Sequence, residues 1–145
     1  MTVLLPASAA RRIGTNTVVA TSADTGGRYS LYRIDLPARS PGAQPHFHTR
    51  FAESFHVLSG EVSLYDGTSW VRGGERDHLF VPQRGVHGFR NDADAPAALL
   101  MMSTPGVARE DYFAELLDAR GQDLTAEQWT ALYARDDQVM VPEQG

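Results

Sequence analysis

Most of the chain consists of short apolar stretches that are interrupted at close intervals by Gly, Pro, Asn or Asp. These four residues favour turns, and turn signals at spacings of roughly 8–12 residues are typical of all-β folds. No stretch before residue 106 has the length and period of a long helix, which disfavours a parallel sheet with crossover helices. The pattern predicts a sandwich or barrel over residues 17–104, with strands at 18–20, 29–36, 46–49, 54–58, 61–65, 69–71, 79–81, 87–90 and 97–103.

Turns and loops punctuate this pattern. Ser40-Pro41-Gly42 is predicted as a loop, and Asp66-Gly67 is typical of a hairpin turn. Residues 82–85, from Pro82 to Gly85, are predicted to turn the chain before His87. These signals fix where the strands end, and they give no information about which strands pair.

The period of the sequence changes after Pro105-Gly106. Apolar residues then recur at helical spacing from Glu110 to Ala119, and Gly121 is expected to end this helix. A second helix is predicted to begin at Thr125, because the sequence from Thr125 to Gln128 has the form of a capping box. We expect both helices, within residues 107–136, to serve as scaffold or dimer surface in a single domain of residues 1–145. The side chains expected to be buried are Phe113, Leu116 and Leu117 in the first helix, and Trp129, Leu132 and Tyr133 in the second.

Composition excludes several kinds of chemistry. The 145 residues include no cysteine, so disulfides, thiolate metal sites and cysteine nucleophiles are excluded. All 13 basic residues are arginine, which rules out a Schiff-base lysine. The net charge is -5 and no basic stripe is present, so we expect no nucleic-acid partner. The sequence shows neither a membrane span nor a secretory signal, and we expect a cytoplasmic protein.

Two histidines lie at the spacing that brings side chains together in a strand. Residues i and i+2 of a strand point to the same face, so His46 and His48 can reach one ion while Phe47 points away. Pro45 cannot donate a hydrogen bond to a neighbouring strand, which suits the start of a strand. The two imidazoles alone are weak support for a metal site.

A carboxylate and a third histidine extend this set. Alternation places Glu53 on the same face as Phe55 and Val57, where a buried charge needs a partner or a metal ion. His87 follows the turn at residues 82–85 and lies on a later strand. Three imidazoles and one carboxylate suit one divalent transition metal (Fe, Mn, Co, Ni, Cu or Zn), whereas Mg²⁺ and Ca²⁺ prefer oxygen ligands.

The joint pattern resembles the two motifs of the cupin superfamily. The first motif corresponds to Gly42, His46-Phe47-His48, Glu53 and Gly60, with four residues between His48 and Glu53 and six between Glu53 and Gly60. The second corresponds to Gly74, Pro82, Gly85, His87 and Asn91. Two spacings depart from the family pattern: Gly42 lies closer to His46, and Gly85 is displaced by one residue. Neither departure affects a ligand position.

The resemblance implies an all-β double-stranded β-helix, that is, a jelly-roll barrel, here with two C-terminal α-helices. It also implies that His46, His48, Glu53 and His87 hold the metal ion inside the barrel, with coordination positions left for a substrate. Within the superfamily, the single-barrel layout, the segment around Glu53 and the C-terminal helices look most like the quercetin 2,3-dioxygenase-like cupins.

Three activities are consistent with this resemblance. The first is a dioxygenase acting on an enolic or phenolic, flavonol-like small molecule with dioxygen, with Glu53 as ligand and general base. The second is a zinc-dependent polyketide cyclase or isomerase, and the third is a non-enzymatic module that binds a metal and a ligand. Exposed sheet edges and extra apolar helices also lead us to expect a homodimer.

The remaining candidates are weaker. His56 faces away from the Glu53 side and is interpreted as a packing or inter-subunit residue, and His78 lies beside charged residues and is expected to be exposed. Other side chains on the strands could flank the cavity of the barrel: Tyr32, Arg33, Phe55, Phe89, Met101 and Met102.

Overall fold

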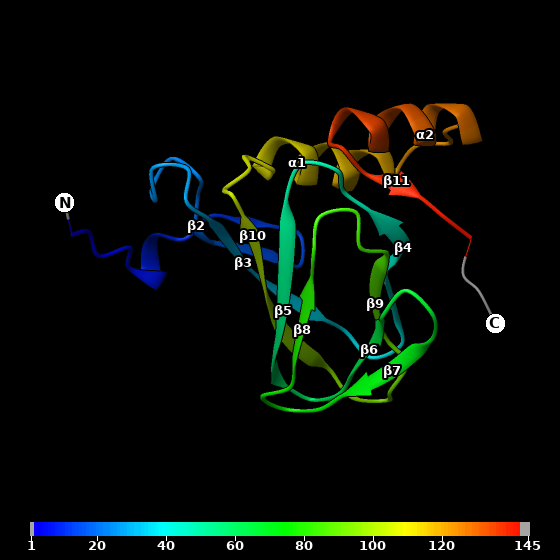
Figure 1. Cartoon of the computed structure of the whole chain (residues 1–145), viewed down its shortest axis with the longest axis horizontal. Helices are drawn as coiled ribbons and strands as arrows, with labels where there is room; N and C mark the ends of the chain where they lie inside the picture. The colour runs from blue at the N-terminus through cyan, green and yellow to red at the C-terminus, as the bar shows by residue number, and fades with distance from the viewer. Residues whose placement is uncertain (1, 143–145) are drawn as a thin grey trace.

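Two antiparallel sheets face each other in the computed structural model, which describes residues 2–142. The first sheet has the order β1-β2-β3-β10-β5-β8 and the second the order β11-β4-β9-β6-β7. Figure 1 shows the two sheets as the walls of a jelly-roll barrel, which confirms the predicted fold class. The strands of the first sheet are β1 (Arg12–Ile13), β2 (Asn16–Ala20), β3 (Ser30–Leu36), β10 (Ala97–Thr104), β5 (Ala52–Ser59) and β8 (His78–Val81). Those of the second are β11 (Val139–Met140), β4 (Ser40–Phe47), β9 (His87–Asn91), β6 (Val62–Tyr65) and β7 (Trp70–Gly73).

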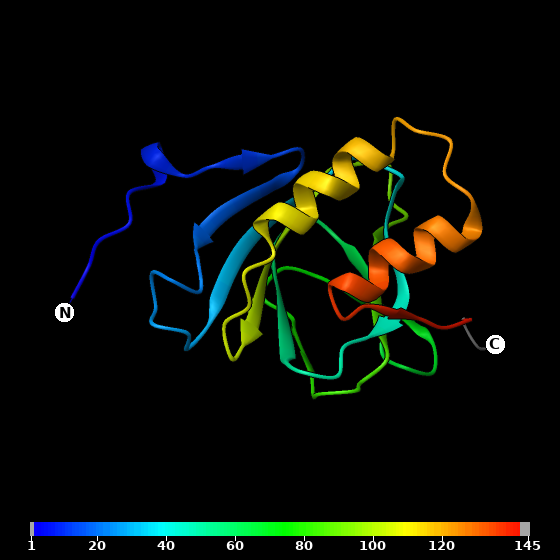
Figure 2. The same ribbon diagram turned by 90° about the horizontal axis from the view of Figure 1, so that it is seen from above.

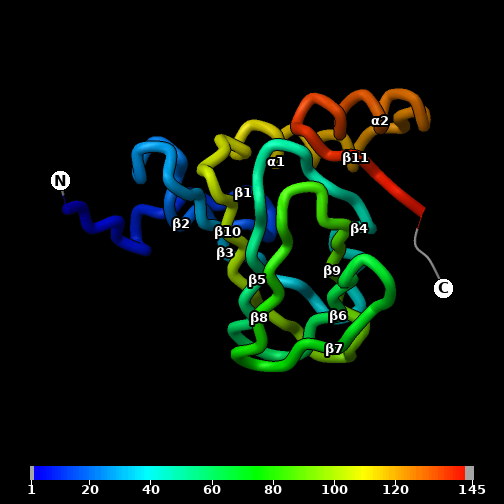
Figure 3. Tube along the Cα trace, viewed as in Figure 1, coloured from blue at the N-terminus to red at the C-terminus, as the bar shows by residue number. Residues whose placement is uncertain are grey.

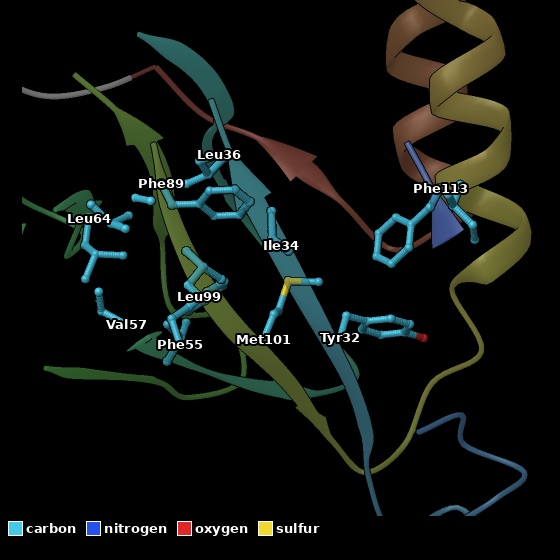
Figure 4. Close-up of a cluster of buried hydrophobic side chains, with 14 of the residues drawn as sticks. Tyr32, Ile34, Leu36, Phe55, Val57, Leu64, Phe89, Leu99, Met101 and Phe113 are labelled. Atoms are coloured by element: carbon cyan, nitrogen blue, oxygen red, sulfur yellow. The ribbon is translucent and has the colours of Figure 1, made fainter. Parts of the chain in front are cut away.

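Alternation along the strands builds the core between the sheets. In β3, Tyr32, Ile34 and Leu36 point inward, while Arg33 lies on the outer surface. The inward side chains of both sheets meet in one cluster, part of which Figure 4 shows. Burial of this apolar area is the main force that holds the two sheets together. At one end of the barrel the core is covered by the two helices.

The two helices form at the predicted places. α1 (Glu110–Ala119) has the predicted bounds, and α2 (Ala126–Arg135) follows Thr125 as its N-cap. The hydroxyl oxygen of Thr125 accepts a hydrogen bond from the amide of Gln128, and the Gln128 side chain accepts one from the amide of Thr125. The predicted capping box is therefore confirmed. Neither helix of the described residues is long and apolar enough to cross a membrane.

The helices lie across one end of the barrel. Figures 2 and 3 show α1 and α2 beside each other over the ends of the strands, with β11 passing beneath α2 to reach β4. Phe113 and Leu132 are buried, and Leu116, Trp129 and Tyr133 are half-buried against the core. Leu117 was expected to be buried with them, but its exposed fraction is 45%. Its side chain packs beside Gly14, between β1 and β2.

The predicted loop at Ser40-Pro41-Gly42 is wrong, because these residues begin β4. The strand continues through an irregular register with β9, with shifts between Ser40 and Ala43 and between Ala43 and His46. Gly42 makes this possible: it has φ +58°, and a Cβ atom there would lie 2.0 Å from the carbonyl oxygen of Phe89. Two short strands were not predicted: β1, and β11 after the second helix. A 3-10 turn, η1 (Ala7–Ala9), precedes them.

Candidate metal centre

Three different strands bring the four predicted side chains to one place. His46 lies in β4 directly opposite His87 in β9, and Glu53 lies in β5. His48 follows β4 by one residue, in the loop that leads to β5. One nitrogen of each imidazole and one oxygen of the carboxylate all lie within 4.8 Å of one another, and every one of the four side chains is buried. The predicted convergence is confirmed.

The three imidazoles each use Nδ1 to bond a backbone carbonyl. Each Nδ1 lies at hydrogen-bond distance from a carbonyl oxygen: 2.6 Å from Gln44 for His46, 2.8 Å from Asp137 for His48, and 3.0 Å from Gly85 for His87. Because a carbonyl oxygen only accepts hydrogen bonds, each Nδ1 carries the hydrogen in this arrangement. A ring with its single hydrogen on Nδ1 has a lone pair on Nε2 that can bind a metal ion, and such backbone bonds are typical of histidines that bind metals.

Glu53 is engaged at both of its carboxylate oxygens. Oε2 lies 2.7 Å from Nε2 of His87 and 3.4 Å from Nε2 of His48, and Oε1 accepts a hydrogen bond of 2.9 Å from Nη1 of Arg109. Burial alone would raise the pKa of Glu53, but the close imidazoles of His48 and His87 and the charge of Arg109 outweigh burial and hold that pKa well below its usual range. The carboxylate is therefore an anion.

Two observations show that this donor set fits a metal ion. Nε2 of His48 is buried and has no hydrogen-bond partner. When Nδ1 of His87 carries the hydrogen, its Nε2 directs a lone pair toward the anionic Oε2 of Glu53, and the two repel each other. A cation bound between Nε2 and Oε2 removes this repulsion. Burial, and then the neighbouring His87 and His48, lower the pKa of His46 well below its usual value, so its ring is neutral and able to bind a metal. The cluster fits one divalent transition metal ion.

Arg109 belongs to this site, and sequence reasoning missed it. It is buried at the N-cap of α1 and joins two carboxylates: Nη1 donates to Glu53, and Nε donates to Oδ2 of Asp136 at 2.8 Å. Burial alone would lower the pKa of Arg109, but the charges of Glu53 and Asp136 raise it. No local pattern singles out this arginine, because its partners are 56 and 27 residues away in the chain.

A cavity of about 460 Å³ lies between the barrel and the helices, and His46, Glu53 and Arg109 form part of its wall. Its apolar wall comes from β3, β9, β10 and α1, and Trp129 and Tyr133 of α2 close another side. Of the side chains expected to flank the cavity, Phe89 and Met101 do so. Tyr32 instead packs its ring on Phe113 and donates a hydrogen bond to Glu110. Burial, and then this hydrogen bond, raise the pKa of Tyr32. The others that do not line it are Arg33, Phe55 and Met102.

The two remaining histidines form a separate pair. His56 and His78 face each other across β5 and β8, with their Nδ1 atoms 3.1 Å apart. His78 is exposed, as predicted, and His56 is half-buried on the side of β5 opposite Glu53. Neither belongs to the cluster of four.

Asn91 and Gly60, two other motif positions, have structural roles. The Asn91 amide nitrogen donates to the carbonyl oxygens of Leu36, Pro37 and Ala95, and its amide oxygen accepts from the backbone nitrogen of Ala93. Gly60 has φ +72° and packs closely against Ala97. These residues hold the barrel turns and do not contact the four donors.

Comparison with known proteins is consistent with this geometry. A protein-family model described as "Cupin domain" matches residues 32–103 of this chain. None of the curated proteins matches the chain in sequence. A predicted oxalate decarboxylase from Thermotoga maritima shares the fold with a TM-score of 0.63 and 17% identity, covering 71% of this chain and 99% of that one.

Two further solved structures are similar in the same way. The Streptomyces protein PAC13 with uridine has a TM-score of 0.59 and 19% identity, over 77% of this chain and 88% of that one. A sugar phosphate isomerase from Silicibacter pomeroyi has a TM-score of 0.53 and 21% identity, over 63% of this chain and 60% of that one. At these identities the likeness shows the fold and leaves the reaction open. The domain match over residues 32–103 and the shared fold support the resemblance to the cupin superfamily.

Proposed function

We propose that this cupin is a metal-dependent dioxygenase that acts on an enolic or phenolic, flavonol-like small molecule. The observation that carries the proposal is the position of the four donors. They converge on a cavity with an apolar wall, and two of them, His46 and Glu53, form part of that wall. A metal ion held only for stability is normally enclosed by its ligands, whereas a catalytic ion faces a space that a substrate can enter.

His46, His48, Glu53 and His87 would hold the metal ion. When bound, the ion would polarise an oxygen of the substrate and, if redox active, allow reaction with dioxygen. The chain itself supplies the surroundings of that oxygen. Phe89, Met101 and Phe113 in the cavity wall suit a flat aromatic ring and exclude water from it.

Glu53 is proposed as both ligand and general base. Its Oε1 accepts a hydrogen bond from the cationic Arg109, so Oε2, on the side of the imidazoles, would take the substrate proton when it moves off the metal ion. A base must lie within hydrogen-bond reach of the hydroxyl whose proton it removes. Arg109 keeps the carboxylate in place while the substrate enters, because it is itself fixed by Asp136.

The proposal is tested by metal analysis followed by oxygen uptake. We expect the purified chain to bind Fe, Mn, Co, Ni or Cu and to consume dioxygen when a flavonol is added, and we expect Glu53→Gln to lose this consumption. Binding of zinc, with conversion of a polyketide-like substrate without dioxygen, would instead support the cyclase or isomerase. Flavonol binding without oxygen uptake in any metal form would contradict the dioxygenase and favour a ligand-binding module.

A further inference from the structure

The segment that follows α2 lies against the candidate metal centre. We name residues 136–140 the C-terminal strap. In Figure 1 it leaves the end of α2 and runs beside β4 as β11. Met140 pairs with His46, and Val139 pairs with Phe47. The strap is outside the two cupin motifs, yet it reaches the strand that carries the first histidine.

Asp137 holds the loop that carries His48 with both its backbone and its side chain. Its carbonyl oxygen accepts the hydrogen bond from Nδ1 of His48 at 2.8 Å. Its carboxylate accepts three more: from the amide of Thr49 at 2.8 Å, the hydroxyl of Thr49 at 2.7 Å and the amide of Arg50 at 2.8 Å. These four bonds bring together residues that are 87 to 89 positions apart in the chain.

Asp137 has the backbone conformation that this arrangement needs. Its φ of +57° is in the left-handed region, which Asp tolerates better than most residues other than Gly. This conformation closes the end of α2: the amides of Asp137 and Gln138 donate to the carbonyls of Ala134 and Tyr133, and the chain then leaves the helix. The carbonyl of Asp137 itself is then directed at His48 rather than along the helix.

Asp136 reaches Glu53 through one intermediate. Its carboxylate accepts a hydrogen bond from Nε of Arg109, and Nη1 of the same guanidinium donates to Oε1 of Glu53. Arg109 is 3% exposed, so these bonds form where water does not compete for them. The strap thus contacts His48 directly, Glu53 through Arg109, and His46 through strand pairing.

We propose that the C-terminal strap is a positioning part of the metal centre, so that metal affinity depends on Asp136 and Asp137 as well as on the four ligands. This inference rests on the proposed metal binding. Asp137 fixes the orientation and the tautomer of His48 before the metal arrives, and Asp136 fixes Glu53 by holding Arg109. Groups of this kind, which orient ligands without touching the metal, change metal affinity when they are removed.

Three variants separate positioning from general stability. Asp137→Gly removes the carboxylate but keeps the carbonyl oxygen and permits the positive φ. Asp137→Asn keeps an accepting oxygen and tolerates the same conformation. Asp77→Gly is the matched control: its carboxylate accepts the amide of Gly74 at 2.8 Å in the turn before β8, which Figure 1 shows at the end of the barrel away from the helices.

The measurement is the dissociation constant for Co²⁺, by competition with a chromophoric chelator at pH 7, together with the visible spectrum of bound Co²⁺. We expect Asp137→Gly to weaken binding by about 10–100-fold and to alter the spectrum. Asp137→Asn should stay close to wild type, and Asp77→Gly should not change the constant. Equal binding by wild type and Asp137→Gly would overturn the inference alone, whereas a wild type that binds no metal would overturn the proposed function with it.

Hydrogen exchange of the wild-type protein provides a test that needs no variant. Because the strap and the His48 loop are joined through Asp137, metal binding should slow exchange at Thr49, Arg50 and residues 137–140 together. Slower exchange in the His48 loop with no change in the strap would contradict the inference.

Discussion

The buried ion pair between Arg109 and Glu53 joins the N-cap of helix α1 to strand β5. Removal of one member of a buried pair leaves the other charge without compensation, which typically costs about 3–5 kcal/mol. We therefore expect Arg109→Met to lower the free energy of unfolding of the metal-free protein by about that amount, as measured by urea denaturation.

Arg135→Met is the control for this prediction. Arg135 donates to Glu115 at 2.8 Å, but both side chains are largely exposed, at 67% and 50%. Exposed pairs contribute at most about 1 kcal/mol, so this variant should lose little. If the two substitutions cost the same, Arg109 does not have the role that the structure gives it.

Gly42 provides a second test at the scale of one residue. In Gly42→Ala the added methyl group would lie 2.0 Å from the carbonyl oxygen of Phe89, and β4 and β9 would have to separate beside Phe89. Gly27→Ala is the control, because Gly27 also has a positive φ of +82° but has nothing within 4 Å of an added Cβ.

Gly27→Ala should lower the free energy of unfolding only by the strain of alanine in the left-handed conformation, about 1–2 kcal/mol. Gly42→Ala should cost clearly more in the same urea titration, because the clash adds to the conformational cost. Equal losses would show that the close approach of β9 is unimportant.

Single residues also show what the sequence could and could not reveal. His46 and His48 were predicted from the period of a strand over residues 46–49, although β4 ends at Phe47 and His48 lies in the following loop. Glu53 was predicted from its place in an apolar alternation. His87 was predicted from its place after the turn at residues 82–85 and from the second cupin motif. Arg109 and Asp137 could not be predicted, because their roles come from partners that are 56 and 89 residues away, and neither stands in a local pattern that marks a site.

At the scale of elements, the helices were predicted best because their signals are local. The capping box at Thr125 and the helical period of residues 110–119 both act within a few residues. The short strands β1 and β11 were missed because two residues carry no detectable period. β4 was predicted too short, since Pro41 and Gly42 are turn residues in most sequences and here begin a strand with irregular register.

The N-cap of α2 can be tested directly, and this helix matters because Trp129 and Tyr133 form part of the cavity wall. Thr125→Ala removes the hydroxyl oxygen that accepts the amide of Gln128, and we expect a loss of about 1 kcal/mol in the free energy of unfolding. Thr130→Ala is the control within the same helix: its hydroxyl donates to the carbonyl of Ala126, and Ala is the better helix former. Thr130→Ala should therefore be neutral or slightly stabilising, and a loss as large as that of Thr125→Ala would contradict the capping account.

At the scale of the whole molecule, the fold places the four donors at the end of the barrel that the helices cover. The jelly roll itself was predicted from many short strands and turns. The cavity beneath α1 and α2 was not predicted, because neither the strand pattern nor the helical period tells how the helices pack on the barrel. The homodimer and the cytoplasmic location stay predictions. Sedimentation velocity of the purified chain tests the first.

Metal binding should stabilise the whole molecule, because the donors lie together only in the folded chain. At a free metal concentration of about 100 times the dissociation constant, the expected gain is about 2.7 kcal/mol, which raises the midpoint of thermal unfolding by about 5–10 °C. His48→Ala should show no such rise. An equal rise in this variant would mean that the metal binds elsewhere.

The central claim, that His46, His48, Glu53 and His87 bind one metal ion, is tested most directly by plasma mass spectrometry of the purified, untagged chain. The control is His56→Ala, which removes a histidine on the other side of β5. We predict close to one equivalent of a divalent transition metal in wild type and in His56→Ala, and its loss in His48→Ala and Glu53→Ala. Wild-type protein that contains no metal, even after reconstitution, would contradict the claim.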